Sequence, residues 1–449
     1  MKTLNRSMLL PAFMLVACAV LFSNLCLAQE TAKSKSDYSI PSDLKPVWTW
    51  KNGYSAEESQ HYRQAYQPDS GTNADDVGSW SVSRWSEIGP SAIVHRYGPV
   101  SELKTEPMPK IAEVVATTAL GTMTLREMMN DPRSRFKAIA VFHKGKLVFE
   151  EYIGIRDWDN HIWASATKIL VGTLAHMMSE EGLIKLENPV TGYLPELQGT
   201  AWEGIKVADV LHQRSGLDIS ESRLGSSPDH PVTLFYAIAG GDPNLPSGTS
   251  LLSAVKTAKK QLEPREAFEY ASINTHVTSL ILQKVAGKPI EDLITERIWS
   301  KAGMEGDGVL GLSASGEPMA FGAYAARLRD LGRFGLLFTP SWNAVSKERV
   351  ISKDYLKKAY VAAKPEIYGK DYMSQRLIKD LGETDLGASY QWDAVFSDGD
   401  LYKSGRTGQC LYISPETDTV VVYYSSSYKA EIWVHAYARE IVKTVFRKK

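Results

Sequence analysis

The chain contains 449 residues, of which 43% are hydrophobic and 23% charged, and its formal net charge is −1. Charges of both signs are interspersed along it, which argues against a nucleic-acid-binding protein. The nine histidines are scattered, and neither His-Glu-x-x-His nor paired Cys-x-x-Cys occurs, so we expect no metal site. No Walker A loop occurs, and we expect no cofactor. The length and apolar content fit one large globular unit with a discontinuous second lobe.

The first 28 residues have the pattern of a secretory signal peptide. Two basic residues precede an apolar stretch that continues to residue 27, and Ala28 is a small residue at a cleavage position. We therefore expect export to the periplasm or out of the cell, with no integral membrane span after cleavage. The alternative is a lipoprotein, because residues 15–18 resemble a lipobox that ends at Cys18. Cleavage after Ala28 would leave Cys410 as the one cysteine, without a disulfide partner.

Residues 29–105 are expected to form an irregular, aromatic-rich extension that wraps the rest of the protein. Their tryptophans follow neither a helical nor a strand period. The segments 136–142 and 147–153 then predict a β-hairpin. Later segments predict helices over 274–285, 290–302, 323–337 and 431–445, and strands over 400–413 and 419–425. Strands therefore come first and last, with helices between, which is typical of an α+β fold.

A nucleophile and its base are predicted at the start of the helix that follows the hairpin. Ser165 and Lys168 are three residues apart, so they share one face of a helix, and a desolvated lysine can accept the proton of a serine hydroxyl. Gly182 ends this helix. The spacing alone is weak, because Ser165 could equally be an N-cap and Lys168 a solvated first-turn residue. The same Ser-x-x-Lys spacing recurs at Ser42, Ser101, Ser134, Ser253 and Ser426.

Two later motifs select the copy at Ser165. Tyr270-Ala-Ser272 precedes the helix over 274–285, and Lys403-Ser404-Gly405 lies on a C-terminal strand. By default Tyr270 would be a half-buried core residue, and Lys403 an edge-strand charge. The order Ser-x-x-Lys, Tyr-x-Ser, Lys-Ser-Gly resembles the class C β-lactamase-related serine hydrolases of the serine β-lactamase and penicillin-binding protein superfamily. The segments His161–Lys168, Glu180–Val190, Leu211–Leu217, Tyr270–Thr275 and Lys403–Gly408 carry this resemblance over residues 135–430.

The resemblance implies a β-lactamase/transpeptidase-like α+β fold. An antiparallel sheet flanked by helices would form a body from residues 106–195 and 320–449, and an all-α lobe from residues 196–319 would be inserted into it. The active site would lie in the cleft between the body and the lobe. No Gly-x-Ser-x-Gly elbow occurs, so the α/β-hydrolase alternative is not favoured.

The resemblance also implies roles for the motif residues. Ser165 would form the acyl-enzyme with Lys168 as its base, and Tyr270 would protonate the leaving group and activate water. Lys168 and Lys403 would lower the pKa of Tyr270. The oxyanion hole would be the backbone N–H groups of Ser165 and Arg406. Ser404 and Gly405 would line the site with Lys403, and Ser272 replaces the asparagine of true class C β-lactamases, which argues against a dedicated β-lactamase.

Three functions remain open from the sequence. The first is an exported hydrolase of esters or small amides, for which Lys403 and Arg406 favour a small-molecule substrate with an anionic group. Relatives that cleave 6-aminohexanoate oligomers belong here, but Ile281 stands where we expect them to carry an additional carboxylate. The second is a β-lactamase or D-amino-acid peptidase acting on peptidoglycan-like substrates. The third is a non-catalytic binding or sensor protein. The oligomeric state is not predicted.

Overall fold

The computed structural model describes residues 44–449 except 69, 71–74, 428–433 and 448–449. The predicted signal peptide, with Cys18, lies outside the described residues. Within the described part of the chain, no helix is both long and apolar enough to span a membrane. The described cysteine, Cys410, is buried and has a free thiol.

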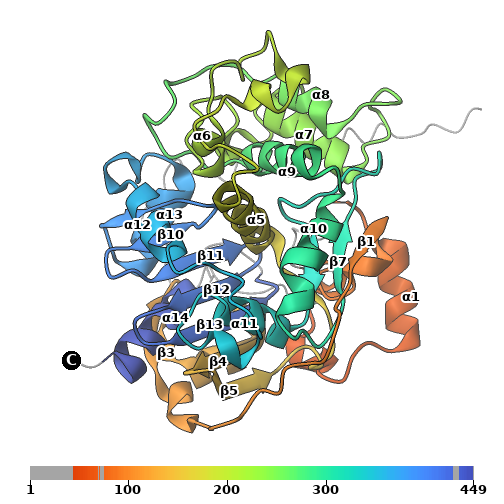
Figure 1. The fold of residues 1–449 in the computed structure, drawn as a ribbon. Coiled ribbons are helices and arrows are strands. Elements are labelled where there is room, and N and C mark those ends of the chain that lie inside the picture. Colours follow the sequence, from red (N-terminus) through yellow and green to blue (C-terminus); the bar gives the residue numbers. More distant parts are fainter. Residues whose placement is uncertain (1–43, 69, 71–74, 428–433, 448–449) are drawn as a thin grey trace, which may run out of the picture.

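A seven-stranded antiparallel sheet forms the centre of the molecule (Figure 1). The predicted hairpin is confirmed, because β4 and β5 pair through a tight turn, and so are the C-terminal strands. Strand β13, from the C-terminal part of the chain, pairs with β4 and so joins the N-terminal hairpin to the C-terminal strands in one sheet. In spatial order the strands are β5 (Lys146–Tyr152), β4 (Phe136–His143), β13 (Thr419–Ser425), β12 (Gln409–Ser414), β11 (Leu401–Gly405), β10 (Ala394–Phe396) and β9 (Leu386–Gly387).

Both faces of this sheet are buried, since alternate side chains of β4 enter two different hydrophobic clusters. Ala140 and Phe142 belong to one cluster, whereas Ile139 and Val141 belong to the other. Helix α11 (Leu328–Leu336) covers the first face, and a Cβ added at its Gly332 would lie 2.1 Å from the Phe142 ring. Helix α14 (His435–Ile441) packs on the second cluster and continues as a π-helical turn over Val442–Phe446.

The predicted single helix over 323–337 is wrong at its N-terminal end. Residues Tyr324–Ala326 form strand β8, and α11 begins only at Leu328. Strand β8 pairs with β7 (Gly308–Gly311) and with β6 (His161–Ile162) in a second antiparallel sheet. Tertiary pairing outweighs the helical propensity of the two alanines here, because the Tyr324 ring is fully buried against the Trp163 indole.

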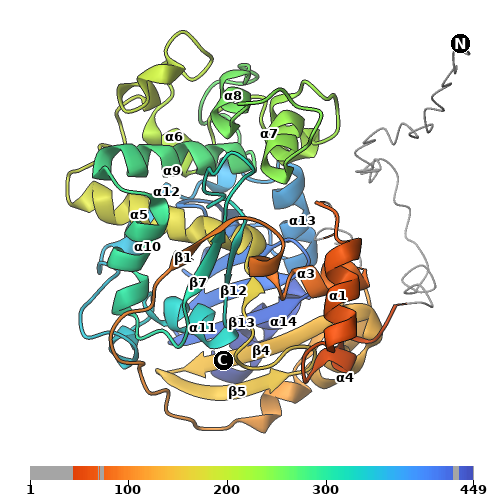
Figure 2. The same cartoon turned by 90° about the vertical axis from the view of Figure 1, so that its right-hand side faces the viewer.

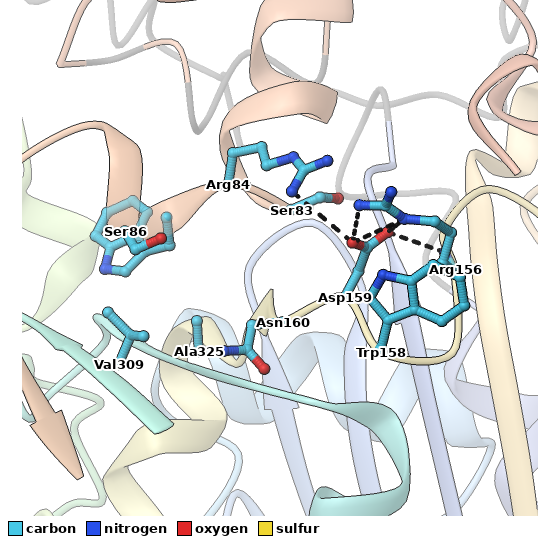
Figure 3. Close-up of a pocket in the computed structure, with 10 residues that line it drawn as sticks. Ser83, Arg84, Ser86, Arg156, Trp158, Asp159, Asn160, Val309 and Ala325 are labelled. Atoms are coloured by element: carbon cyan, nitrogen blue, oxygen red, sulfur yellow. Dashed lines mark hydrogen bonds and ion pairs between the residues drawn. The ribbon is translucent and has the colours of Figure 1, made fainter. Parts of the chain in front are cut away.

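The described part of the extension lies along one side of the molecule (Figure 2). It contains α1 (Ala56–Ala65), α3 (Asp76–Ser81) and β1 (Ser91–Val94), and β1 pairs with β7. A small aromatic cluster of Trp50, Tyr62 and Trp80 holds its helices together. Residues 83–86 also line a surface cavity of about 330 Å³, where Arg84 and Arg156 are directed at Asp159 (Figure 3). This segment is therefore more regular than the sequence predicts, and it packs against the body.

The helices between residues 207 and 286 lie above α5 at one end of the molecule in Figure 1, and α10, α12 and α13 lie beside it. The expected helices over 274–285 and 290–302 are present as α9 and α10, although an ordinary α-helix ends at Arg297 and a 3₁₀ turn follows. These helices are α5 (Lys168–Glu180), α6 (Val207–Leu211), α7 (Pro231–Gly240), α8 (Leu251–Lys256), α9 (Ser272–Ala286) and α10 (Ile290–Arg297), with α12 (Tyr355–Ala362) and α13 (Tyr372–Leu381) beside β9 and β10. Shorter elements are β2 (Val115–Thr118), β3 (Gly121–Thr124) and α4 (Leu125–Asn130).

Candidate active site

Ser165 lies on a 3₁₀ turn, Ala164–Thr167, and the α-helix begins only at Lys168. Ser165 and Lys168 are still close together, although Ser165 is not in the α-helix, because residues i and i+3 are eclipsed in a 3₁₀ turn. Ala164 has a φ of 46°, in the left-handed region that non-glycine residues rarely adopt. The turn is held from both ends, since Trp163 N donates to Tyr324 O at 2.6 Å and Tyr324 N donates to Thr167 Oγ1 at 3.2 Å. Strand β8 therefore holds the strained turn that presents Ser165.

The Lys168 amine is fully buried beside the Ser165 hydroxyl. Its Nζ lies 3.1 Å from Ser165 Oγ and donates to Phe321 O at 2.6 Å. Burial lowers the pKa of Lys168 from 10.5 to about 7, and the positive charge of Lys403 acts in the same direction. A substantial fraction of the lysine is therefore neutral near pH 7 and able to accept the Ser165 proton.

Tyr270 lies just before α9, as predicted, and the side-chain nitrogens of two lysines lie near its ring. Lys168 Nζ is 5.1 Å and Lys403 Nζ is 4.8 Å from the ring centroid, and Lys403 Nζ donates to the Tyr270 hydroxyl at 3.4 Å. Our expectation of a lowered pKa is wrong. Burial, followed by the negative charges of Asp393 and Glu221, raises the pKa of Tyr270 well above its ordinary value, and the hydrogen bond with Ser165 opposes this only in part. The resting phenol is therefore neutral.

Lys403 lies on β11 and forms a buried ion pair with Asp393, a residue that the sequence analysis missed. The same carboxylate accepts from Ser404 N at 2.8 Å and from Ser404 Oγ at 2.6 Å, so two residues of the third motif are held by one acid. The one local signal for Asp393 is Asp398-Gly399, a dipeptide typical of a hairpin turn. With Ala394 paired to Tyr402, that hairpin places residue 393 opposite Lys403.

Gly405 allows strand β11 to come directly beside the nucleophile turn. A Cβ on Gly405 would lie 2.3 Å from Trp163 O, a distance that no real side chain tolerates. Arg406, the next residue, is exposed, and its charge acts on the phenols of Tyr236 and Tyr372. The structure thus brings the third motif against the segment that carries Ser165.

Ser272 belongs to a polar cluster that the sequence analysis did not anticipate. Its hydroxyl donates a very short hydrogen bond to the Glu221 carboxylate, which also accepts from Ser272 N at 3.1 Å and from the Tyr236 hydroxyl at 2.8 Å. Glu221 N donates to Tyr270 O at 2.9 Å. Ser272 and Glu221 therefore hold the Tyr270 backbone in place. No local pattern marks Glu221, since it begins a short 3₁₀ turn, Glu221–Arg223, that lies 51 residues before Ser272 in the sequence.

Ile281 and the glycines at positions 306, 308 and 311 lie outside the three motifs. Ile281, on α9, is fully buried in the hydrophobic core. The prediction that its lack of a carboxylate disfavours 6-aminohexanoate oligomers stays a prediction. Gly306, Gly308 and Gly311 match the spacing Gly-x-Gly-x-x-Gly, but they lead into and form strand β7 rather than a strand-to-helix turn. Among the described residues, no group of three or more His, Cys, Asp or Glu side chains is arranged to hold a metal ion.

The sequence matches the family described as beta-lactamase over residues 124–439, which is more than half of the chain. The chain belongs to the beta-lactamase family. Ser165, Lys168, Tyr270 and Lys403 all lie inside the matched range. The predicted family and fold class are thus confirmed, and the protein is an enzyme of the serine hydrolase type.

Similar proteins are named for different hydrolase activities. The 6-aminohexanoate-dimer hydrolase of Paenarthrobacter ureafaciens is 26% identical over 359 residues, which cover 77% of this chain and 85% of that protein. A beta-lactamase of Yersinia enterocolitica is 31% identical over 118 residues, or 24% of this chain and 29% of that protein. Among solved structures, a candidate 6-aminohexanoate-dimer hydrolase from Bacillus anthracis matches with a TM-score of 0.68 at 21% identity, covering 83% of this chain and 94% of the other. EstCE1, a hydrolase with promiscuous acyltransferase activity, matches with a TM-score of 0.55 at 16% identity, covering 72% and 98%.

Proposed function

We propose that this enzyme cleaves an ester or a small amide through an acyl-enzyme formed on Ser165. The observation that carries the proposal is the buried Lys168 amine, 3.1 Å from Ser165 Oγ, whose pKa is lowered to about 7. A buried lysine with this pKa costs more stability than its hydrogen bond to Phe321 O returns, and such perturbed groups are concentrated at functional sites. Its position beside a partly exposed serine, on a strained turn, fits a nucleophile and its base.

In the acylation half, Ser165 Oγ attacks the carbonyl carbon while its proton passes to Lys168 Nζ. The oxyanion would be stabilised by the backbone N–H groups of Ser165 and Arg406, each worth about 3 kcal/mol of barrier. Tyr270, neutral at rest, donates its proton to the leaving group as the C–O or C–N bond breaks. It recovers a proton from the Lys168 ammonium, whose nitrogen lies 5.1 Å from the ring centroid. Both groups then return to their neutral forms.

In the deacylation half, a water molecule attacks the acyl carbon and its proton passes to the neutral Lys168. Ser165 Oγ leaves with a proton supplied through the same two groups, and the acid product is released. The Lys403 ammonium, held by Asp393, favours transient negative charge on the Tyr270 oxygen, 3.4 Å away. Asp393 is therefore a positioning residue for Lys403, and Ser404 in turn holds Asp393.

Of the two cations considered for recognition of an anionic substrate, we favour Arg406 over Lys403. Lys403 is fully buried and paired with Asp393, so it offers little to a substrate carboxylate. Arg406 is exposed at the same end of β11, near Tyr236 and Tyr372, and it is the better candidate for contact with an anionic group. Substrates with an acyl or leaving group that bears a carboxylate should therefore depend on Arg406.

A β-lactamase or D-amino-acid peptidase is the second candidate, favoured by the family match over residues 124–439 and by the similarity to the Yersinia beta-lactamase. Both functions would use the same acyl-enzyme. They differ in the substrate, and Ser272, which is tied to Glu221, is not placed to act as the asparagine of true class C enzymes does. We also propose that the enzyme is exported through residues 1–28. Detection of a mature chain that begins after Ala28 in the exported fraction would support this.

The proposal is tested by intact-mass spectrometry of the purified protein after exposure to p-nitrophenyl esters, nitrocefin and a fluorophosphonate. Covalent mass gain and ester turnover should be lost in Ser165→Ala and in Lys168→Ala. Ser101→Ala, at another Ser-x-x-Lys site, is the matched control and should retain both. Faster turnover of nitrocefin than of esters would favour the β-lactamase. No labelling and no turnover of any substrate would leave a non-catalytic binding protein.

A further inference from the structure

A cavity of about 280 Å³ borders the segment that leads into Tyr270. The cavity is separate from the site around Ser165 and Lys168, since neither residue lines it. One part of its wall is apolar and is formed by Leu262, Ala267 and Phe268. Another part of the wall is polar and is formed by Glu269 and Asp371, together with Tyr372, Ser220 and Ser222.

Glu269 is the unusual group in this cavity. Its side chain is only 8% exposed, yet the carboxylate oxygen Oε2 is buried without a hydrogen-bond partner. Buried carboxylates in proteins are ordinarily paired with a cation or with several donors. Here the nearby charges are negative, because Asp371, Asp218 and Glu266 all act to raise the pKa of Glu269. The protein itself therefore leaves this carboxylate without a counter-charge.

The two basic residues that line the cavity are engaged elsewhere. Arg223 forms an ion pair with Asp218, with Nε 3.3 Å from the carboxylate oxygen. Lys370 Nζ donates to the backbone carbonyl of Glu266 at 3.0 Å. Asp371 uses its oxygens for Ser220 Oγ at 2.8 Å and for Met373 N at 2.9 Å. Glu269 is thus the group that could receive a cation from outside.

We propose that this cavity binds a small organic ammonium ion whose N–H groups donate to the Glu269 carboxylate. The apolar wall of Leu262, Ala267 and Phe268 would cover the alkyl part of the same molecule. A bare metal ion fits poorly, because the described residues hold no cluster of three or more ligating side chains. The volume is also several times the roughly 30 Å³ that one water molecule occupies in the liquid.

Occupancy of the cavity would be transmitted to Tyr270 through the backbone. Glu269 directly precedes Tyr270, and Asp371 accepts a hydrogen bond from the Tyr270 backbone N–H. Tyr372 lines the cavity and also acts electrostatically on the Tyr270 phenol. A cation at Glu269 relieves the repulsion between Glu269 and Asp371 and so stabilises the segment that positions Tyr270. This coupling rests on the proposed catalytic role of Tyr270, whereas the binding site itself does not.

The binding site is tested by isothermal titration of the purified protein with n-butylammonium chloride at pH 8, with NaCl and KCl at equal ionic strength as references. We expect saturable binding of butylammonium only, and at least a tenfold loss of affinity in Glu269→Gln. Glu266→Gln, at the exposed rim of the same cavity, is the matched control and should change the affinity less than threefold. Ala267→Leu keeps every carboxylate but fills the apolar part, and it should also lose at least tenfold.

Three results would overturn the proposal. The first is the absence of saturable binding to the wild-type protein, and the second is unchanged binding in folded Glu269→Gln and Ala267→Leu. The third is loss of butylammonium binding after Ser165 has been blocked with a fluorophosphonate, which would place the cation in the catalytic cleft, near Glu221. Binding that persists in the blocked enzyme supports the separate cavity. Because titration requires no turnover, a failure of the proposed hydrolase activity leaves this result interpretable.

Discussion

Replacing Lys168 by methionine should stabilise the protein at low pH while abolishing hydrolysis. The fall of the Lys168 pKa from 10.5 to about 7 corresponds to a penalty of about 5 kcal/mol for the charged form. The unfolded chain binds this proton below pH 10.5 and the folded chain only below about pH 7, so the free energy of unfolding rises with pH between these values. The penalty is complete below pH 7. It is nearly absent above pH 10.

Methionine has a similar shape but cannot replace the hydrogen bond to Phe321 O, which is 2.6 Å long. Leaving that carbonyl unpaired costs about 1–3 kcal/mol. The net gain for Lys168→Met at pH 6 should therefore be about 2–4 kcal/mol, and it should vanish or reverse by pH 10. The gain at low pH is the stability that the wild-type protein gives up to hold a base beside Ser165.

The assay is urea unfolding followed by tryptophan fluorescence at pH 6, 8 and 10, together with p-nitrophenyl ester turnover. Lys256→Met, an exposed lysine at the end of α8, is the matched control and should leave both the stability and its pH dependence unchanged. If Lys168→Met is less stable than the wild-type protein at pH 6, or if the difference between them does not depend on pH, the lysine is not desolvated as the structure indicates. Its role as a neutral base would then lose its physical basis.

Three further substitutions test other parts of the site. Asp393→Asn leaves the buried Lys403 ammonium unpaired and should cost about 3 kcal/mol in urea unfolding, with a large loss of ester turnover; an unchanged unfolding midpoint would contradict a charged Lys403. Gly405→Ala places a Cβ 2.3 Å from Trp163 O, so kcat should fall at least a hundredfold in a protein with a normal circular dichroism spectrum, and full activity would disprove this close approach. Glu269→Gln should raise the free energy of unfolding by about 1 kcal/mol at pH 8 but not at pH 4. Burial and the nearby Asp371, Asp218 and Glu266 raise the folded pKa of Glu269 from 4.5 to about 7, and stability is lost as pH rises through that range; equal effects at both pH values would refute it.

Local patterns in the sequence were sufficient for the elements and for the choice of the nucleophile. The hairpin of β4 and β5, the C-terminal strands and α9 were predicted because each depends on the periodicity of its own segment. Ser165 and Lys168 were brought together by a spacing of three residues, which holds in an α-helix and in the 3₁₀ turn that the structure contains. The order of the three motifs indicated the family, which the match over residues 124–439 confirms.

Tertiary structure alone decided the electrostatics of the site. Asp393 and Glu221 reach Lys403 and Ser272 from other parts of the chain, and no local pattern reveals such partners. The pKa of Tyr270 was predicted to fall because two lysines flank it, but complete burial outweighs them. Residues 324–326 likewise became a strand through pairing with β7. Burial and long-range pairing depend on which distant segments pack together, and this information is not present in any single segment of the sequence.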